Sequence, residues 1–136
     1  KPGTSKIYST ENGESCDDEL NFIRKGRNYG WGPGYLCGTA GVGDDPKAPI
    51  KRWSNIIVPT DPTWYNGRMK SLSGDLYVGD FRGGLHRMVM NAKANRVKDD
   101  RIIHESPDGI VDVAKGPGGW LYYVTPGGIY KIVPTN

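Results

Sequence analysis

Short apolar runs are spaced along the chain in a way that leaves few folds open to it. They are mostly four to six residues long, and glycine, proline, asparagine or aspartate bounds each of them. Runs of this length between turn residues are typical of β-strands. No window keeps a helical period of 3.6 residues, so we expect an all-β protein with almost no helix. The expected strands are 6–11, 20–24, 55–58, 64–65, 75–80, 85–90, 101–104, 110–113, 120–124 and 128–133.

One strand pair occurs twice. The stretch DLYVGDFRGGLHRMVM (75–90) resembles WLYYVTPGGIYKIVP (120–134), and both copies consist of a strand, a Gly-Gly turn and a strand. Leu76 aligns with Leu121 at an offset of 45 residues. A strand-pair unit that recurs at this interval is typical of β-propeller blades. Two ordinary hairpins of a β-sandwich would explain the periodicity equally well.

The propeller interpretation makes residues 1–136 a single partial domain. Residues 1–53 would hold the end of one blade and a long cysteine-clamped loop, 54–106 a full four-stranded blade, and 107–136 three strands of the last blade. About two and a half antiparallel blades result, whereas closed propellers need roughly four or more. Open sheet edges pair with other strands. The expected partners are therefore missing blades of a longer protein, or further copies of the chain in a homo-oligomer.

The charge and hydropathy pattern excludes two classes of partner. With 18 basic and 15 acidic side chains, the net charge of +3 is too balanced to favour nucleic acid. No apolar run approaches the roughly 18 residues of a membrane span. No signal peptide is visible, and the start at Lys1-Pro2-Gly3 looks like the interior of a longer protein or a processed terminus.

Cys16 and Cys37 bracket a glycine-rich stretch. A disulfide that closes a loop of this size would stabilise the fold by about 3 kcal/mol in the chain-entropy model. It would also favour an extracytoplasmic location, whether secreted, periplasmic or at the cell surface. Two free thiols in a reducing cytosol are the alternative. Zinc is disfavoured, because no CxxC and no nearby histidine complete a tetrahedral set.

Three motifs follow one another around these cysteines: Glu11-Asn12-Gly13, Asp18-Glu19-Leu20-Asn21 and GRNYGW at 26–31. The stretches IVPT at 57–60, GDLYVGD at 74–80 and the run from Asp112-Val113 to GPGGWLY at 116–122 come later. In this order they resemble the soluble glucose and sorbosone dehydrogenase family, six-bladed propellers that use pyrroloquinoline quinone (PQQ). The resemblance implies that the chain is similar to the C-terminal third of such a protein and is incomplete as a propeller.

The resemblance also implies metal ligands near the cysteines. The carboxylate of Glu19 and the backbone carbonyl of Tyr29 would hold a structural calcium, a hard cation that prefers oxygen ligands. A solvated turn at Asp18 and Glu19 is the alternative. Members of the secreted branch carry cysteines where this chain has Cys16 and Cys37, which agrees with a disulfide.

Three further residues would bind the cofactor if the resemblance holds. The backbone carbonyls of Gly13 and Glu14 would bind the calcium that sits on the quinone, although the family usually has proline at the position of Glu14. Arg82 would face the carboxylates of the quinone, for which a guanidinium is well suited. The alternatives are a plain glycine turn at Gly13 and a solvated hairpin arginine at Arg82.

No catalytic residue is assigned to this chain. The family places two arginines where this chain has Gly109 and Val111, and its general-base histidine lies in an earlier blade. His86 and His104 do not match that histidine, and we expect both to be structural or surface residues. Asp44-Asp45 and Asp99-Asp100 are expected to be solvated turns.

We therefore expect part of a PQQ- and calcium-dependent sugar dehydrogenase-like propeller that is not catalytic by itself and that contacts a sugar. The alternative is a non-catalytic propeller module that binds protein or glycan and is completed by oligomerisation.

Overall fold

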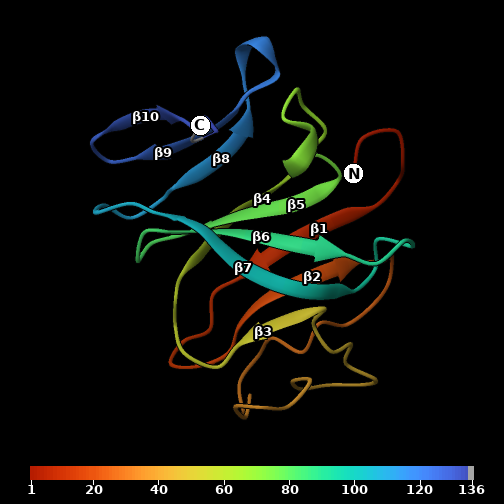
Figure 1. Cartoon of the computed structure of the whole chain (residues 1–136). Coiled ribbons are helices and arrows are strands. Elements are labelled where there is room, and N and C mark those ends of the chain that lie inside the picture. The colour runs from red at the N-terminus through yellow and green to blue at the C-terminus, as the bar shows by residue number, and fades with distance from the viewer. Residues whose placement is uncertain (135–136) are drawn as a thin grey trace. The chain divides into compact units, whose positions relative to one another are not determined.

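The computed structural model describes residues 1–134 and confirms an all-β architecture (Figure 1). Its strands form three antiparallel sheets, and helix is limited in the described residues to two 3-10 turns, Lys70–Leu72 and Pro117–Gly119. Neither turn is long or apolar enough to span a membrane. The chain divides into two compact units, Lys1–Val58 and Pro59–Asn136, which are described separately.

The first unit contains a three-stranded sheet in the order β1 (Ile7–Glu11), β2 (Asp18–Ile23) and β3 (Lys51–Trp53). In the central strand β2, Asp18, Glu19, Leu20 and Asn21 are all buried. The segment between β2 and β3 forms a long loop without regular strands. The buried start of β2 thus contains three polar residues, Asp18, Glu19 and Asn21, together with Leu20.

The expected strand at 55–58 is wrong, and β3 lies just before it. The backbone amides of Ile57 and Val58 donate to Oδ2 of Asp18 at 2.6 and 2.7 Å instead of pairing with a strand. Val58 also has a φ of +57°, in the left-handed region that an extended strand excludes. The buried carboxylate of Asp18 thus accepts the hydrogen bonds that these two amides would otherwise donate to a neighbouring strand.

The second unit contains a complete four-stranded sheet in the order of the chain. Its strands are β4 (Pro59–Tyr65), β5 (Asp75–Asp80), β6 (Gly84–Met90) and β7 (Val97–Glu105). All six residues of β5 are buried, whereas most of the outer strand β7 is partly or fully exposed. Asp99 and Asp100 lie in β7, so the expected turn at these residues is wrong.

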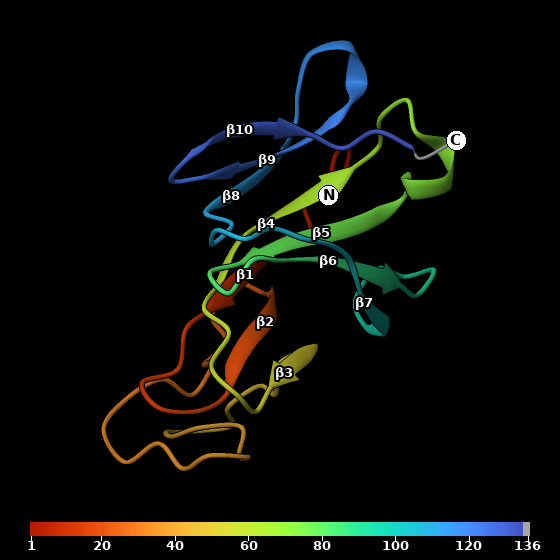
Figure 2. The same cartoon turned by 60° about the vertical axis from the view of Figure 1, so that its left-hand side comes forward.

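A second sheet of this unit has the order β10 (Gly128–Lys131), β9 (Leu121–Thr125) and β8 (Asp112–Lys115). Figure 2 shows β8 beside β4, the first strand of the four-stranded sheet. The two Gly-Gly hairpins join β5 to β6 and β9 to β10 and so belong to different sheets. Side chains from both sheets share one core: Tyr65, Met69, Tyr77, Leu85, Ile110, Val113, Leu121 and Tyr123.

The close contact between the two sheets depends on a glycine in β5. A Cβ at Gly79 would collide with the side chain of Ile110, which lies just before β8. Within the described residues, β10 has a strand neighbour on one side only. The sheets are antiparallel propeller blades, and the set is incomplete in this chain. The expected segment boundaries after residues 53 and 106 remain predictions.

Candidate functional site

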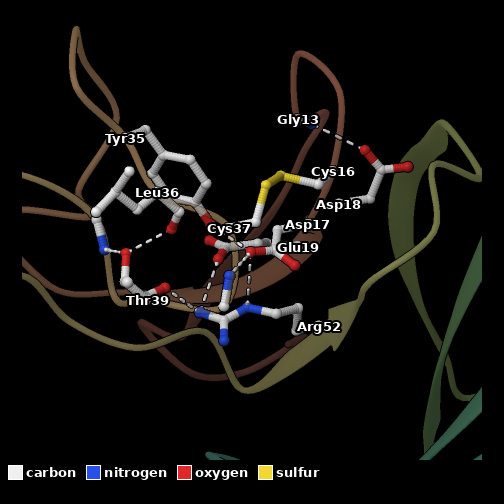
Figure 3. The surroundings of a disulfide bond; sticks show 12 residues. Gly13, Cys16, Asp17, Asp18, Glu19, Tyr35, Leu36, Cys37, Thr39 and Arg52 are labelled. Carbon is white, nitrogen blue, oxygen red and sulfur yellow. Dashed lines mark hydrogen bonds and ion pairs between the residues drawn. A yellow bond between two sulfur atoms is a disulfide. The ribbon is translucent and has the colours of Figure 1, made fainter.

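A disulfide joins Cys16 and Cys37, whose Cα atoms lie 6.0 Å apart, and the alternative of two free thiols is wrong (Figure 3). The bridge ties the glycine-rich loop to the segment just before β2, which begins at Asp18. Cys16, Asp17 and Cys37 bring potential metal-ligand atoms within 4.8 Å of one another. Because both sulfurs are consumed in the disulfide, only Asp17 of this group is an available ligand.

Asp17 fixes the loop from the other side. It is buried, its φ is +59°, and its Oδ2 accepts hydrogen bonds from the backbone N–H of Gly38 and from the hydroxyl of Tyr35 at 2.9 Å. Burial, followed by this hydrogen bond, raises the pKa of Tyr35 to about 12. Tyr35 therefore remains a hydrogen-bond donor throughout the physiological range, and its ring is held beside the disulfide.

Asp18 organises the backbone around the start of β2. Its Oδ1 accepts from the backbone N–H of Gly13 at 2.8 Å, in addition to the two amides that its Oδ2 accepts from the segment after β3. A Cβ at Gly13 would collide with the carbonyl oxygen of Cys16. The turn at Gly13 is therefore closed so tightly that only glycine fits.

Glu19 is 4% exposed, so the alternative of a solvated turn at Asp18 and Glu19 is wrong. Burial raises the pKa of Glu19, while Asn21 and Arg52 act against that rise. Asn21 Nδ2 lies 3.2 Å from Oε2 of Glu19, and Nη2 of Arg52 lies 3.5 Å from Oε1. Arg52 also donates to the carbonyl of Thr39, so the guanidinium joins the carboxylate to the disulfide loop (Figure 3).

Oxygen atoms of β2 and of the loop that follows it suit a hard cation in their chemistry. Oδ1 of Asn21 is buried and has no hydrogen-bond partner among the described residues. The hydroxyl of Tyr29 donates to the carbonyl of Phe22 at 2.9 Å, while the backbone carbonyl of Tyr29 accepts nothing from the described residues. Carboxylate and carbonyl oxygens are the ligands that calcium prefers. Arg52 is the cation that competes for the same carboxylate.

Glu14 is exposed and helps to line an open pocket of about 360 Å³. Residues 14–16 form one side of this pocket, and residues 31–35 with Cys37 form the other. The carbonyls of Gly13 and Glu14 accept no hydrogen bond from the described residues, so they are available to a metal ion. Sequence reasoning missed this pocket, although the aromatic and glycine-rich stretch at 29–35 is the signal that could have found it.

Arg82 lies in the second unit, in the exposed turn between β5 and β6. Its backbone N–H donates to Oδ1 of Asp80 at 2.7 Å, and Gly84 donates to the same oxygen at 3.0 Å. The guanidinium of Arg82 forms no ion pair with any described residue. It is therefore free to bind an anionic group, and it fits a carboxylate-bearing cofactor in charge.

His86 is buried between two carboxylates, a network that sequence reasoning also missed. Its Nε2 lies 2.9 Å from Oδ2 of Asp80, and its Nδ1 lies 2.7 Å from Oδ1 of Asp100. His104 is half-buried, with its Nε2 2.9 Å from the hydroxyl of Tyr123. Both histidines thus contact partners within their own unit.

Gly109 and Val111 occupy the positions where two arginines were expected from the family, and the space for a side chain differs between them. A Cβ at Gly109 would lie 2.6 Å from the carbonyl oxygen of Phe81, closer than real Cβ atoms approach. Val111 is partly exposed, and its backbone N–H donates to Val124 at 2.8 Å. The backbone around Gly109 is therefore built for glycine and has no room for a longer side chain.

Comparisons with known proteins agree with the fold and the motifs. The family model described as Glucose / Sorbosone dehydrogenase matches residues 1–131. The uncharacterized protein slr1608 of Synechocystis is 32% identical over 91% of this chain and 32% of its own length. Aldose sugar dehydrogenase YliI of Escherichia coli is 27% identical over 99% of this chain and 40% of its own length.

A solved structure supports the same fold. The PQQ-bound form of aldose sugar dehydrogenase from Streptomyces coelicolor superposes with a TM-score of 0.69 at 24% identity. The match covers 88% of this chain and 34% of that one. The chain thus spans only about a third to two fifths of the length of these relatives and is a partial domain.

Proposed function

The chain belongs to the glucose and sorbosone dehydrogenase family, and we propose that it forms part of a PQQ- and calcium-dependent sugar dehydrogenase-like propeller. The observation that carries this proposal is the family match, which runs through all three sheets from residue 1 to residue 131. The sugar dehydrogenase relatives, one of them solved with PQQ bound, supply the class of reaction. In this proposal the chain contributes part of the rim of the active site.

Each proposed ligand has an atom to offer. The free carbonyls of Gly13 and Glu14 would hold the calcium of the cofactor, and the guanidinium of Arg82 would bind a carboxylate of the quinone. The chemistry that a bound quinone supplies is the uptake of a hydride from the sugar. Glu19 and the carbonyl of Tyr29 would hold a second, structural calcium that stiffens the loop closed by the disulfide.

This chain by itself would not catalyse the reaction. None of its residues is proposed to take the proton of the sugar hydroxyl, because His86 and His104 are engaged with partners inside their unit. The remaining blades would come from the rest of a longer protein, or from further copies of the chain. An extracytoplasmic location is proposed as well, because disulfides persist in oxidising compartments.

A second candidate is a non-catalytic propeller module that binds protein or glycan. The geometry at Gly109 favours it, because the carbonyl of Phe81 leaves no room there for the arginine that the sugar-oxidising members carry. In this version the cofactor ligands would serve only as loop structure. Mass spectrometry of the native polypeptide would help to decide between the enzyme and the binding module. A polypeptide about three times as long as this chain would favour the enzyme.

Binding of PQQ to the full-length protein that contains this chain tests the proposal directly. We expect saturable binding in the presence of calcium, followed by absorbance titration, and loss of that binding in excess chelator. The Arg82→Ala variant should bind PQQ about tenfold more weakly, as expected when one charge-assisted contact is removed. Arg101→Ala is the matched control, since Arg101 is an exposed arginine paired with Asp99. Absence of calcium-dependent binding in the unmodified protein would refute the proposal.

A further inference from the structure

The pocket beside the disulfide combines aromatic rings with a carboxylate and a hydroxyl group. Trp31 forms one wall and is 58% exposed, and the ring of Tyr35 lies 6.4 Å from it at a tilt of 38°. Glu14 and Ser15 stand on the other side. We propose that this pocket binds one pyranose ring of an aldose or of its oligosaccharide, with a face of the sugar packed on Trp31. The inference rests on the proposed function for the class of sugar, and it deepens that function by locating a sugar subsite.

The chemistry of the lining selects a neutral, hydroxyl-rich ligand. No lysine or arginine lines the pocket, which argues against sugar phosphates and against the quinone as its occupant. A pyranose presents C–H groups on its faces and hydroxyls at its edge. An indole attracts C–H groups with its electron-rich face, and a carboxylate makes strong hydrogen bonds to hydroxyls.

Groups suited to bind sugar hydroxyls remain unused within the described residues. The carboxylate of Glu14 forms no ion pair there, and neither the indole N–H of Trp31 nor the hydroxyl of Ser15 has a hydrogen-bond partner. Specific ligand pockets place a few such polar groups around an apolar surface, and they have volumes of roughly 300–1,000 Å³. The volume of this pocket, about 360 Å³, lies at the small end of that range and therefore suits one sugar ring.

The walls of the pocket are held before any ligand arrives. The disulfide joins both sides, and Asp17 anchors the hydroxyl of Tyr35. Asn28 closes the loop by donating from Nδ2 to the carbonyl of Val42 at 2.7 Å and accepting at Oδ1 from the amide of Gly30 at 2.8 Å. Because the rings are positioned in advance, a ligand loses less free energy to ordering the loop.

The position of the pocket links it to the proposed cofactor ligands. Glu14 lines the pocket, and its carbonyl and that of Gly13 are the proposed ligands of the cofactor calcium. All of these residues lie in the first unit, so the placement depends on that unit alone. A sugar stacked on Trp31 would therefore lie next to the calcium ligands.

Sugar titrations of the full-length protein test the inference without the quinone. Glucose and maltose should quench tryptophan fluorescence saturably, and calorimetry should give the same dissociation constant. Trp31→Ala should raise that constant about tenfold or more, as truncation of an aromatic anchor does, while Trp31→Phe should retain part of the affinity. Glu14→Gln should also weaken binding. Leu36→Ala is the matched control, since Leu36 is 69% exposed in the same loop but does not line the pocket.

The results separate this inference from the proposed function. If glucose and maltose bind equally well to the unmodified protein and to Trp31→Ala, or do not bind at all, the subsite is refuted, whatever the quinone does. Aromatic rings beside a carboxylate also suit a quaternary ammonium ion. If tetramethylammonium binds in the pocket and the sugars do not, the proposed sugar subsite is wrong. If sugar binding depends on Trp31 but PQQ does not bind, the subsite stands and the proposed function fails.

Discussion

Deprotonation of His86 by alkaline pH should remove a measurable part of the stability of the second unit. Both ring nitrogens of His86 face carboxylates, Asp80 from β5 and Asp100 from β7, so each nitrogen carries a proton in the charged form. Burial by itself would lower the pKa of His86, but the hydrogen bonds and charges of Asp100 and Asp80 outweigh it and raise the pKa to about 9. The charged histidine joins three neighbouring strands through their side chains.

The sign and size of the effect follow from proton linkage. A histidine whose pKa is about 6.5 when unfolded and about 9 when folded contributes fully below pH of about 6.5. The contribution declines as the pH rises and is largely gone above pH of about 9, with a total of about 3 kcal/mol. The network also holds the β5–β6 turn, because the other oxygen of Asp80 accepts the amides of Arg82 and Gly84.

Urea denaturation at pH 6 and pH 9.5 measures this contribution. The free energy of unfolding of the unmodified protein should fall by about 3 kcal/mol more than that of His86→Gln over this interval. His104→Gln should show the same fall as the unmodified protein. Equal pH dependence in the unmodified protein and His86→Gln would refute the reasoning, as would an NMR titration that places the pKa of His86 near 6.5.

Three shorter predictions concern the rest of the chain. Cys16→Ser should lower the free energy of unfolding by about 3 kcal/mol in oxidising buffer, and the difference should vanish when the unmodified protein is measured in reductant. In the absence of PQQ, calcium should raise the melting temperature, and Glu19→Gln should reduce that increase; an equal calcium response in Glu19→Gln and the unmodified protein would contradict the assignment of Glu19. Gly109→Arg should cost about 1–3 kcal/mol in urea denaturation, because its Cβ has no room beside the carbonyl of Phe81.

Local patterning was enough to predict most of the sheet structure. The run Asp75–Asp80 forms a strand with the expected bounds. A short apolar run next to a glycine turn is a local signal, so neighbouring residues alone are enough to predict such a strand. The segment 55–58 is equally apolar, yet Asp18, some forty residues earlier, binds its amides and removes it from the sheet. Contacts between residues so far apart cannot be read from local spacing.

The candidate site was also predictable only where local sequence patterns define it. The disulfide followed from two cysteines that bracket a loop. The roles of Glu19 and Arg82 were inferred from family motifs, and they remain predictions. The networks around Asp17 and His86 did not, since each joins residues that no motif pairs. A turn was expected at Asp99 and Asp100 because two adjacent acidic residues are usually solvated. Both lie in a strand instead, where the carboxylate of Asp100 pairs with the buried His86.

Strand β10 is an edge strand among the residues that the structure describes, with β9 as its neighbour on one side and no strand on the other. Ile129 in β10 is 73% exposed and Tyr130 is 42% exposed, and neither proline nor a charged residue interrupts the strand before Lys131. An exposed edge strand of this kind can pair with a strand of another molecule. A recombinant version of this segment would therefore tend to polymerise as its concentration rises, and Ile129→Lys would keep it in solution.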